Sequence, residues 1–390
     1  LPILNIMRKK FLSGLLVAAM VASMTACGSD PTANNNSSSD KNSDSGKKKV
    51  GISMPTKSLE RWNRDGSYLE EQFKKDGYDV EITYSDNDTD QQVNDIQNMI
   101  SDNVDILVVA AIDGDTLSTV LADAKDQNIP VISYDRLIMN TDAISYYVSF
   151  DNYKVGQLQG QYIIDTLKLD GSKKKYNMEV TAGDPADNNA TFFYNGAMDT
   201  LKKYIDDGTV KIVSKQQDFE SVATPQWSTD EALNRMQNIL SSYYADGKNQ
   251  LDIALCSNDS TALGVTQAIE SDYAGKNTPL ITGQDGDVAN LKNILDGKQA
   301  MTVYKAVANE AVVTLKLVKS VLDGNTPDES LTKEFDCECS YDTDSYDNGT
   351  GKIPSYLLTP EVITKDNYKE KLVDTGYYKE GSDGYLQAIE

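Results

Sequence analysis

The 390-residue chain contains no histidine, only four cysteines and only two tryptophans. The absence of His removes the commonest general base near neutral pH, the Ser-His-Asp type of triad and metal sites built on imidazole. Phosphate loops are missing too, because no G-x-x-x-x-G-K-[ST] motif occurs and no G-x-G-x-x-G motif follows a predicted strand. These absences argue against nucleotide chemistry and against many classes of enzyme.

Positive charge is also scarce. The chain has 37 Lys and Arg residues against 60 Asp and Glu residues, so its formal net charge is −23. Nucleic-acid phosphates and anionic lipid surfaces both require basic patches, so neither is an expected partner. Hydrophobic residues make up 39% of the chain, which is enough for a core, and the length suits one large or two medium domains.

The few cysteines do not form the pattern of a disulfide scaffold. Cys256 lies in a predicted buried strand, where it would act as a small hydrophobe. Cys337 and Cys339 form a C-x-C pair, which is too few ligands for a zinc site in a chain without His. Two free thiols, a strained disulfide or an intermolecular disulfide remain open for this pair. We expect neither a metal nor a cofactor.

The N-terminal segment predicts export. Translation is expected to start at Met7, followed by the basic run Arg8–Lys10 and the apolar run Phe11–Met24, which is too short to span a bilayer. Small residues then precede Cys27, as in a lipobox. We therefore predict a signal peptide over 1–26, a lipid on Cys27 and a flexible polar tether over 27–49. The alternative is ordinary secretion with an incidental Cys.

From Val50 onward, short apolar runs alternate with helical patterns. The run Val104–Ala110 is continuously apolar, which is typical of a strand that is covered on both faces. Regular alternation predicts parallel sheets with helices on both faces, and the number of strands is too large for one comfortable sheet. We therefore predict an α/β protein with two Rossmann-like, doubly wound lobes and a cleft between them.

Polar and aromatic side chains follow the predicted strands at their carboxyl ends, where ligands bind in open α/β sheets. They are Lys57, Arg61, Trp62, Asp135, Arg136, Asn188, Asn189, Trp227, Asn258, Asp285 and Lys305. Carboxylates accept from sugar hydroxyls, Arg, Lys and Asn donate to them, and an indole suits the apolar face of a pyranose. Taken singly, Asp135 or Asn258 could cap a helix, Arg136 could form a surface ion pair and Trp227 could be core. Their recurrence at successive strand ends favours a polyol pocket.

Several segments resemble the type I periplasmic sugar-binding proteins of ABC transporters, and most closely their xylose-binding and multiple-monosaccharide-binding branches. The segments are Met54–Lys57, Glu60–Trp62, Tyr134–Ile138, Ser149–Asn152, Asp187–Ala190, Ser257–Asp259, Gly283–Asp285, Val303–Lys305, Ile353–Pro360 and Gly376–Glu380. They occur in this order over nearly the whole chain from Val50 onward.

The resemblance implies two lobes that are joined by three hinge crossovers and close around a monosaccharide such as xylose, glucose or galactose. Crossovers are expected near 149–151, near 303–305 and within 336–353. The first lobe would then comprise 50–149 and 305–335, and the second 150–304 and 336–390. The resemblance further implies a monomer that is anchored outside the cytoplasm and delivers its sugar to an ABC permease. The alternative partner is a chemoreceptor or a two-component sensor.

Two further readings are weaker. Asp135 and Asp285 could be the paired carboxylates of a glycosidase, but Arg136 would keep Asp135 ionised, which is poor for a general acid, so we expect no enzyme. Asp86, Asp88 and Asp90 are spaced like the start of a calcium loop, yet Gln91 stands where such a loop needs Gly. We expect this segment to cap a helix, and we expect the acidic stretch 336–351 to be a solvated loop.

Overall fold

The computed structural model describes residues 46–389. The predicted signal peptide, Cys27 and most of the predicted tether lie outside the described residues. Within 46–389, no helix has the length and apolar character required to cross a bilayer.

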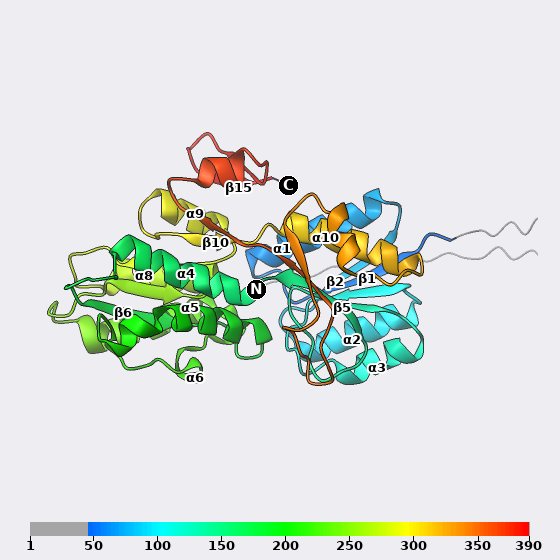
Figure 1. The fold of residues 1–390 in the computed structure, drawn as a ribbon, viewed down its shortest axis with the longest axis horizontal. Coiled ribbons are helices and arrows are strands. Elements are labelled where there is room, and N and C mark those ends of the chain that lie inside the picture. Colours follow the sequence, from blue (N-terminus) through cyan, green and yellow to red (C-terminus); the bar gives the residue numbers. More distant parts are fainter. Residues whose placement is uncertain (1–45, 390) are drawn as a thin grey trace, which may run out of the picture. The chain divides into compact units, whose positions relative to one another are not determined.

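The first sheet has seven strands in the order β11-β12-β5-β4-β3-β1-β2, and all neighbours are parallel except β11 and β12. Its strands are β1 (Lys49–Met54), β2 (Asp79–Tyr84), β3 (Ile106–Val109), β4 (Val131–Tyr134), β5 (Ile144–Phe150), β11 (Cys339–Asp342) and β12 (Ser355–Leu358). Its helices are α1 (Glu60–Lys75), α2 (Thr89–Ser101), α3 (Ser118–Asp126) and α10 (Val307–Leu322). We call this sheet with these helices the first lobe (Figure 1).

The second sheet has four parallel strands in the order β7-β6-β8-β9. Its strands are β6 (Tyr176–Thr181), β7 (Val210–Ile212), β8 (Ile253–Cys256) and β9 (Leu280–Ile281). Its helices are α4 (Asn152–Leu167), α5 (Asn188–Asp206), α6 (Phe219–Val222), α7 (Thr229–Ile239), α8 (Asp259–Asp272) and α9 (Val288–Leu295). We call this part, together with β10 (Thr302–Tyr304), the second lobe.

Each sheet is covered by helices on both faces. In the first lobe, Phe73 of α1 and Leu317 of α10 pack with Ile52 on one face, while α2 and α3 pack on the other (Figure 1). In the second lobe, α4 and α5 cover one face and α7 and α8 the other. This arrangement explains why β3 and β8 are buried along their whole length, and it confirms the predicted doubly wound α/β fold.

The chain passes between the two sheets three times. It crosses between β5 and α4, between β10 and α10, and between β12 and β13 (Glu361–Ile363), which pairs with β10. The first two crossings lie where the resemblance implied them. The third lies at Thr359–Pro360 and not within 336–353, so that expectation was wrong.

The same correction applies to the segment that precedes this crossing. Residues 336–390 were all assigned to the second lobe, but β12 pairs in parallel with β5, with Ser355 opposite Tyr147, and β11 pairs with β12. Residues 339–358 therefore belong to the first sheet. The remaining lobe boundaries stay a prediction, because Gly46–Glu390 form one unit by their contacts. The chain ends in the small hairpin β14 (Tyr378–Glu380) and β15 (Leu386–Ala388).

Local expectations for several side chains can also be compared with the structure. Asp88 caps α2 by accepting from the amide of Gln91, which confirms the capping interpretation of the Asp86–Asp90 segment. Cys256 is fully buried in β8, as expected, and Cys337 and Cys339 are free thiols. The acidic stretch 336–351 is not a solvated loop throughout, because 339–342 form β11 and Asn348 is fully buried. Asp342, at the end of β11, accepts from the amides of residues 344 and 345.

Candidate ligand-binding site

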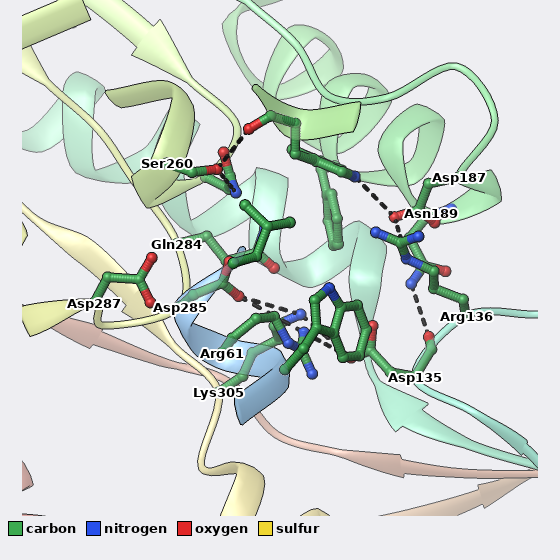
Figure 2. A pocket seen from close by; sticks show the side chains of 15 residues that line it. Arg61, Asp135, Arg136, Asp187, Asn189, Ser260, Gln284, Asp285, Asp287 and Lys305 are labelled. Atoms are coloured by element: carbon green, nitrogen blue, oxygen red, sulfur yellow. Dashed lines mark hydrogen bonds and ion pairs between the residues drawn. The ribbon is translucent and has the colours of Figure 1, made fainter. Parts of the chain in front are cut away.

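One cavity collects side chains from the carboxyl ends of strands in both lobes (Figure 2). Its walls are formed by Leu59, Arg61, Trp62, Asp135, Arg136, Asp187, Asn189, Phe193, Trp227, Asn258, Ser260, Gln284, Asp285, Asp287 and Lys305. All predicted site residues are therefore brought together except Lys57 and Asn188. Parallel strands end at a common edge, which is why segments far apart in the sequence meet here.

A cluster of charges lies at the floor of the cavity. Arg61 Nη1 lies 2.9 Å from Asp135 Oδ2, and Lys305 Nζ lies 3.4 Å from the same atom. Both cations also face Asp285 of the second lobe, at 3.8 Å and 3.4 Å from its Oδ1 (Figure 2). Because Lys305 follows β10 at a crossing between the lobes, its ammonium group can contact carboxylates of both lobes.

Burial and neighbouring charges shift the pKa values of the carboxyl groups in this cluster. Burial alone would raise the pKa of Asp135, but neighbouring cations, Arg61 first and then Lys305, lower it to about 2. Asp135 is therefore ionised at neutral pH. Burial raises the pKa of Asp65, which accepts from Arg61, and raises that of Glu310 well above its usual range. The same cluster thus lowers the pKa of one carboxyl group and raises the pKa of two others.

A second polar group spans the cavity at its other wall. Arg136 Nε of the first lobe lies 3.0 Å from Asp187 Oδ2 of the second lobe, and the same carboxylate accepts from the indole of Trp227 at 3.2 Å. Arg136 is also held in place by the carbonyl oxygens of Ala111 and Ile112. Asn189 donates to the carbonyl oxygen of Asp135 at 2.7 Å, so this wall too contains contacts between the lobes.

Four cavity-lining atoms are buried without a hydrogen-bond partner: Nε1 of Trp62, Nε of Arg136, Oε1 of Gln284 and Oδ1 of Asp285. Arg136 Nε and Asp285 Oδ1 still face opposite charges, whereas Trp62 Nε1 and Gln284 Oε1, a donor and an acceptor, have no partner. A buried polar atom that lacks a partner costs free energy, so such atoms are rare unless a ligand or water satisfies them. The pair is therefore suited to a ligand that carries both donors and acceptors.

The backbone of the cavity is strained at three places. Asp135, Trp227 and Asp285 have φ values of +57°, +55° and +105°, in a region that non-glycine residues seldom adopt. Such conformations persist where the surrounding structure holds them, and they cluster at functional sites. At Gly183, a Cβ atom would lie 1.9 Å from the Trp227 ring, so only glycine permits this placement of the indole.

The structure decides between several interpretations of single residues. Asn258 caps α8 by accepting from the amide of Thr261, and it also lines the cavity, so both roles hold. Arg136 is 6% exposed and is not a surface ion pair. Trp227 is 4% exposed and packs with Phe193, so it belongs both to a hydrophobic cluster and to the cavity wall.

Two predicted site residues lie elsewhere. Lys57 is exposed, with its Nζ 4.7 Å from the centre of the Tyr84 ring. Asn188 is half-buried at the start of α5 and does not line the cavity, whereas Asn189 does. Consecutive helical residues point about 100° apart, so only one of the two can face the cavity.

Sequence reasoning missed Leu59, Asp187, Phe193, Ser260, Gln284 and Asp287 as lining residues. Asp187 and Gln284 stand beside predicted residues in the same strand-end segments, so their position was a usable signal. Leu59 and Phe193 are apolar and carry no local signal of this kind.

Asp135 is not suited to act as a general acid. A general acid must carry a proton near neutral pH, and the lowered pKa of Asp135 rules out that role for this side chain. Among residues 46–389, no group of three or more His, Cys, Asp or Glu side chains is arranged to hold a metal ion. The cavity instead offers acceptors, cationic donors and two indoles to one polar molecule.

Two doubly wound lobes with three crossings and a shared cavity define a type I periplasmic binding protein. The sequence agrees, because the profile of the Periplasmic binding protein domain family matches residues 50–326. The chain belongs to this family, and the resemblance to the type I sugar-binding proteins of ABC transporters is confirmed.

Characterised relatives cover most of the chain. The multiple sugar-binding periplasmic receptor ChvE of Rhizobium radiobacter is 41% identical over 333 residues, which is 85% of this chain and 90% of that protein. The D-xylose-binding periplasmic protein of Escherichia coli is 34% identical over 333 residues, 85% of this chain and 91% of the relative. A solved ABC transporter solute binding protein from Clostridium phytofermentans with bound β-D-glucose is 52% identical, with a TM-score of 0.80 over 85% of this chain and 99% of that chain.

Proposed function

We propose that this protein captures one monosaccharide, an aldopentose or aldohexose such as xylose, glucose or galactose, between its two lobes. The observation that carries the proposal is the cavity itself. It combines ionised Asp135, the cations Arg61 and Lys305, and unpartnered polar atoms on Trp62 and Gln284. Sugar hydroxyls donate and accept at once, so a ring can satisfy both kinds of atom.

The relatives support the same class of ligand. The proteins named above include one described as binding multiple sugars, one described as binding D-xylose and one solved with β-D-glucose. Xylose and glucose differ by one hydroxymethyl group, so a site of this kind can serve both a pentose and a hexose. Hydrogen bonds from charged groups to the sugar would contribute about 1.5–3 kcal/mol each.

Isothermal titration calorimetry with a panel of pentoses and hexoses tests the proposal. We expect at least one sugar to bind with a Kd in the micromolar range or below. Asp135→Asn should weaken that binding by about tenfold to a hundredfold, because it removes the charge that Arg61 and Lys305 face. Asp170→Asn, at an exposed ion pair with Lys203, is the matched control. The absence of binding to every sugar would refute the proposal.

The partner and the location follow from the same proposal. An ABC permease would receive the sugar from the closed protein, because hinge closure gives the loaded form a surface that the open form lacks. A lipid on Cys27 would hold the protein at the outer face of the cell membrane through the polar segment 28–49. Family membership supports extracytoplasmic sugar transport, while the lipid anchor and the monomeric state are proposed from the sequence.

A further inference from the structure

Arg64 of α1 reaches from the first lobe to the loop of the second lobe that carries Asp285. Its Nη2 donates to the carbonyl oxygen of Asp285 at 3.0 Å and to Asp287 Oδ1 at 3.1 Å. Its Nη1 donates to the carbonyl oxygen of Gly286 at 3.2 Å. One side chain of the first lobe therefore holds three consecutive residues of the second.

The C-terminal hairpin secures the same loop. Tyr378 of β14 is 2% exposed, and its hydroxyl donates to the carbonyl oxygen of Gly286 at 2.5 Å. The hydroxyl also accepts from Arg64 Nη1, and the guanidinium carbon lies 5.9 Å from the centre of the tyrosine ring. A segment that follows the third crossing therefore takes part in the contact between the lobes.

Glu60 adds a second bond from α1, one turn before Arg64. Both of its carboxylate oxygens lie 3.2 Å from the amide nitrogen of Val288, the first residue of α9. The amino end of a helix carries partial positive charge, which favours a carboxylate there. The side chain of Asp287, at the N-cap position of α9, makes no capping bond, so the first lobe supplies this contact.

None of Glu60, Arg64 and Tyr378 lines the cavity. Within the second lobe, the loop is fastened separately, because Asp259 accepts from the amide of Asp287 at 2.9 Å and from the hydroxyl of Thr302 at 3.0 Å. The bonds of Glu60 and Arg64 to this loop depend on the lobes being together, whereas the bonds of Asp259 do not.

We propose that Arg64, with Glu60 and Tyr378, forms a latch that holds the lobes closed, positions Asp285 in the cavity and slows release of the bound sugar. The inference rests on the proposed sugar binding. Arg64 is a positioning residue, since it acts on the ligand only through the loop. Figure 2 shows Asp285 and Asp287, the two loop carboxylates at this boundary, on the same side of the cavity.

The latch also has a pH signature. Burial raises the pKa of Asp287 to about 7. The charged and titratable groups around this carboxyl are Glu60, Arg61, Arg64, Asp259, Asp285 and Tyr378. When the lobes part, Asp287 is hydrated and its pKa falls towards the ordinary value of 3.8, so closing takes up a proton.

The extra stability of the closed form is complete below this ordinary pKa and is lost as pH rises through about 7. Sugar should therefore bind more tightly at pH 6 than at pH 8, and Asp287→Asn should reduce this difference.

Stopped-flow fluorescence can measure the latch, because the only two tryptophans, Trp62 and Trp227, both line the cavity. We expect Arg64→Met to raise the dissociation rate of the best panel sugar about tenfold or more, with the association rate changed less than about threefold. Tyr378→Phe and Glu60→Gln should raise it by less. Should Arg64→Met fail to fold, these two variants carry the test.

Arg235→Met is the matched control, because Arg235 is also part-buried but bonds only within the second lobe, to Val180, Thr181 and Gln216. It should lower the melting temperature and leave the sugar off-rate unchanged. An off-rate that stays unchanged in Arg64→Met, while the wild type binds sugar, would overturn the latch. Absence of sugar binding in the wild type would instead refute the proposed function.

Discussion

At the scale of single residues, many carboxyl groups in and around the cavity share few cationic side chains. Arg61 faces Asp65, Asp135, Asp285 and Glu310 within 4 Å. Glu310, in the first turn of α10, has both carboxyl oxygens buried without a hydrogen-bond partner. Burial, followed by the charges of Asp135 and Asp65, raises its pKa well above the usual range.

Glu310→Gln should therefore stabilise the protein at high pH. A raised pKa in the folded state adds stability below the ordinary value of 4.5, and this stability is lost as pH rises through the folded value. Glutamine has no proton to lose, so the variant should melt above the wild type at pH 8, by roughly 2–4 °C for each kcal/mol recovered, and close to it near pH 4.5. Differential scanning calorimetry across this range is the measurement.

The exposed Glu71 of α1 provides the control, and Glu71→Gln should leave the melting temperature unchanged at either pH. A Glu310→Gln variant that melts below the wild type at pH 8 would mean that Glu310 is ionised and acts as a counterion of Arg61.

Among the elements, the contact between α4 and α5 depends on glycine. A Cβ atom at Gly156 would lie 2.0 Å from the carbonyl oxygen of Phe193, and one at Gly196 would lie 2.1 Å from that of Tyr153. The two helix backbones therefore touch, with no room for a side chain between them. Because α5 presents Asn189 and Phe193 to the cavity, this packing sets the position of one wall.

Gly196→Ala should force the helices apart. We expect a loss of about 1–3 kcal/mol in the free energy of unfolding, measured by urea denaturation, together with weaker sugar binding because α5 moves relative to the first lobe. Gln161→Ala, on the exposed face of α4, should change neither quantity. Full stability in Gly196→Ala would show that the two helices can separate at no cost.

At the scale of the whole molecule, two lobes are joined by three crossings and share one cavity. Contacts between them include Arg61 with Asp285, Arg136 with Asp187, and the latch around Arg64. Closure therefore requires several pairs to form together, which favours a closed and an open state over intermediate ones. The net charge of −23 disfavours electrostatic binding to anionic lipid surfaces.

Cys27→Ala tests the proposed anchor. The wild type should fractionate with membranes and carry a lipid mass at Cys27, while the variant should be released as a soluble protein. Cys256→Ala is the control, because Cys256 is buried in β8, and it should stay with the membranes. Wild-type protein without a lipid mass would contradict the anchor and leave secretion without attachment.

The alternation of apolar runs and helical stripes was sufficient to predict the doubly wound fold. Strand positions up to Tyr304 follow from such local patterns, as the fully buried runs of β3 and β8 illustrate. The strands β11 to β15 were missed, because they are short and β11 is half-exposed beside an acidic loop. Their pairing partners lie far away in the sequence, and periodicity contains no information on such distant pairing.

The residues of the site, like the strands, were predicted only in part. Residue type and position at a strand end sufficed to identify Arg61, Asp135, Asp285 and Lys305, because parallel strands bring their carboxyl ends to one edge. Which neighbour faces the cavity, Asn189 and not Asn188, depends on the rotation of a packed helix.

The sequence by itself therefore determined the fold class and the chemistry of the strand ends, because both depend on local pattern. Only the tertiary structure decided that β12 lies beside β5, that Glu310 is buried with a raised pKa, and that Arg64 bonds across the lobes. Each of these depends on atoms that are distant in the sequence and are brought together by packing.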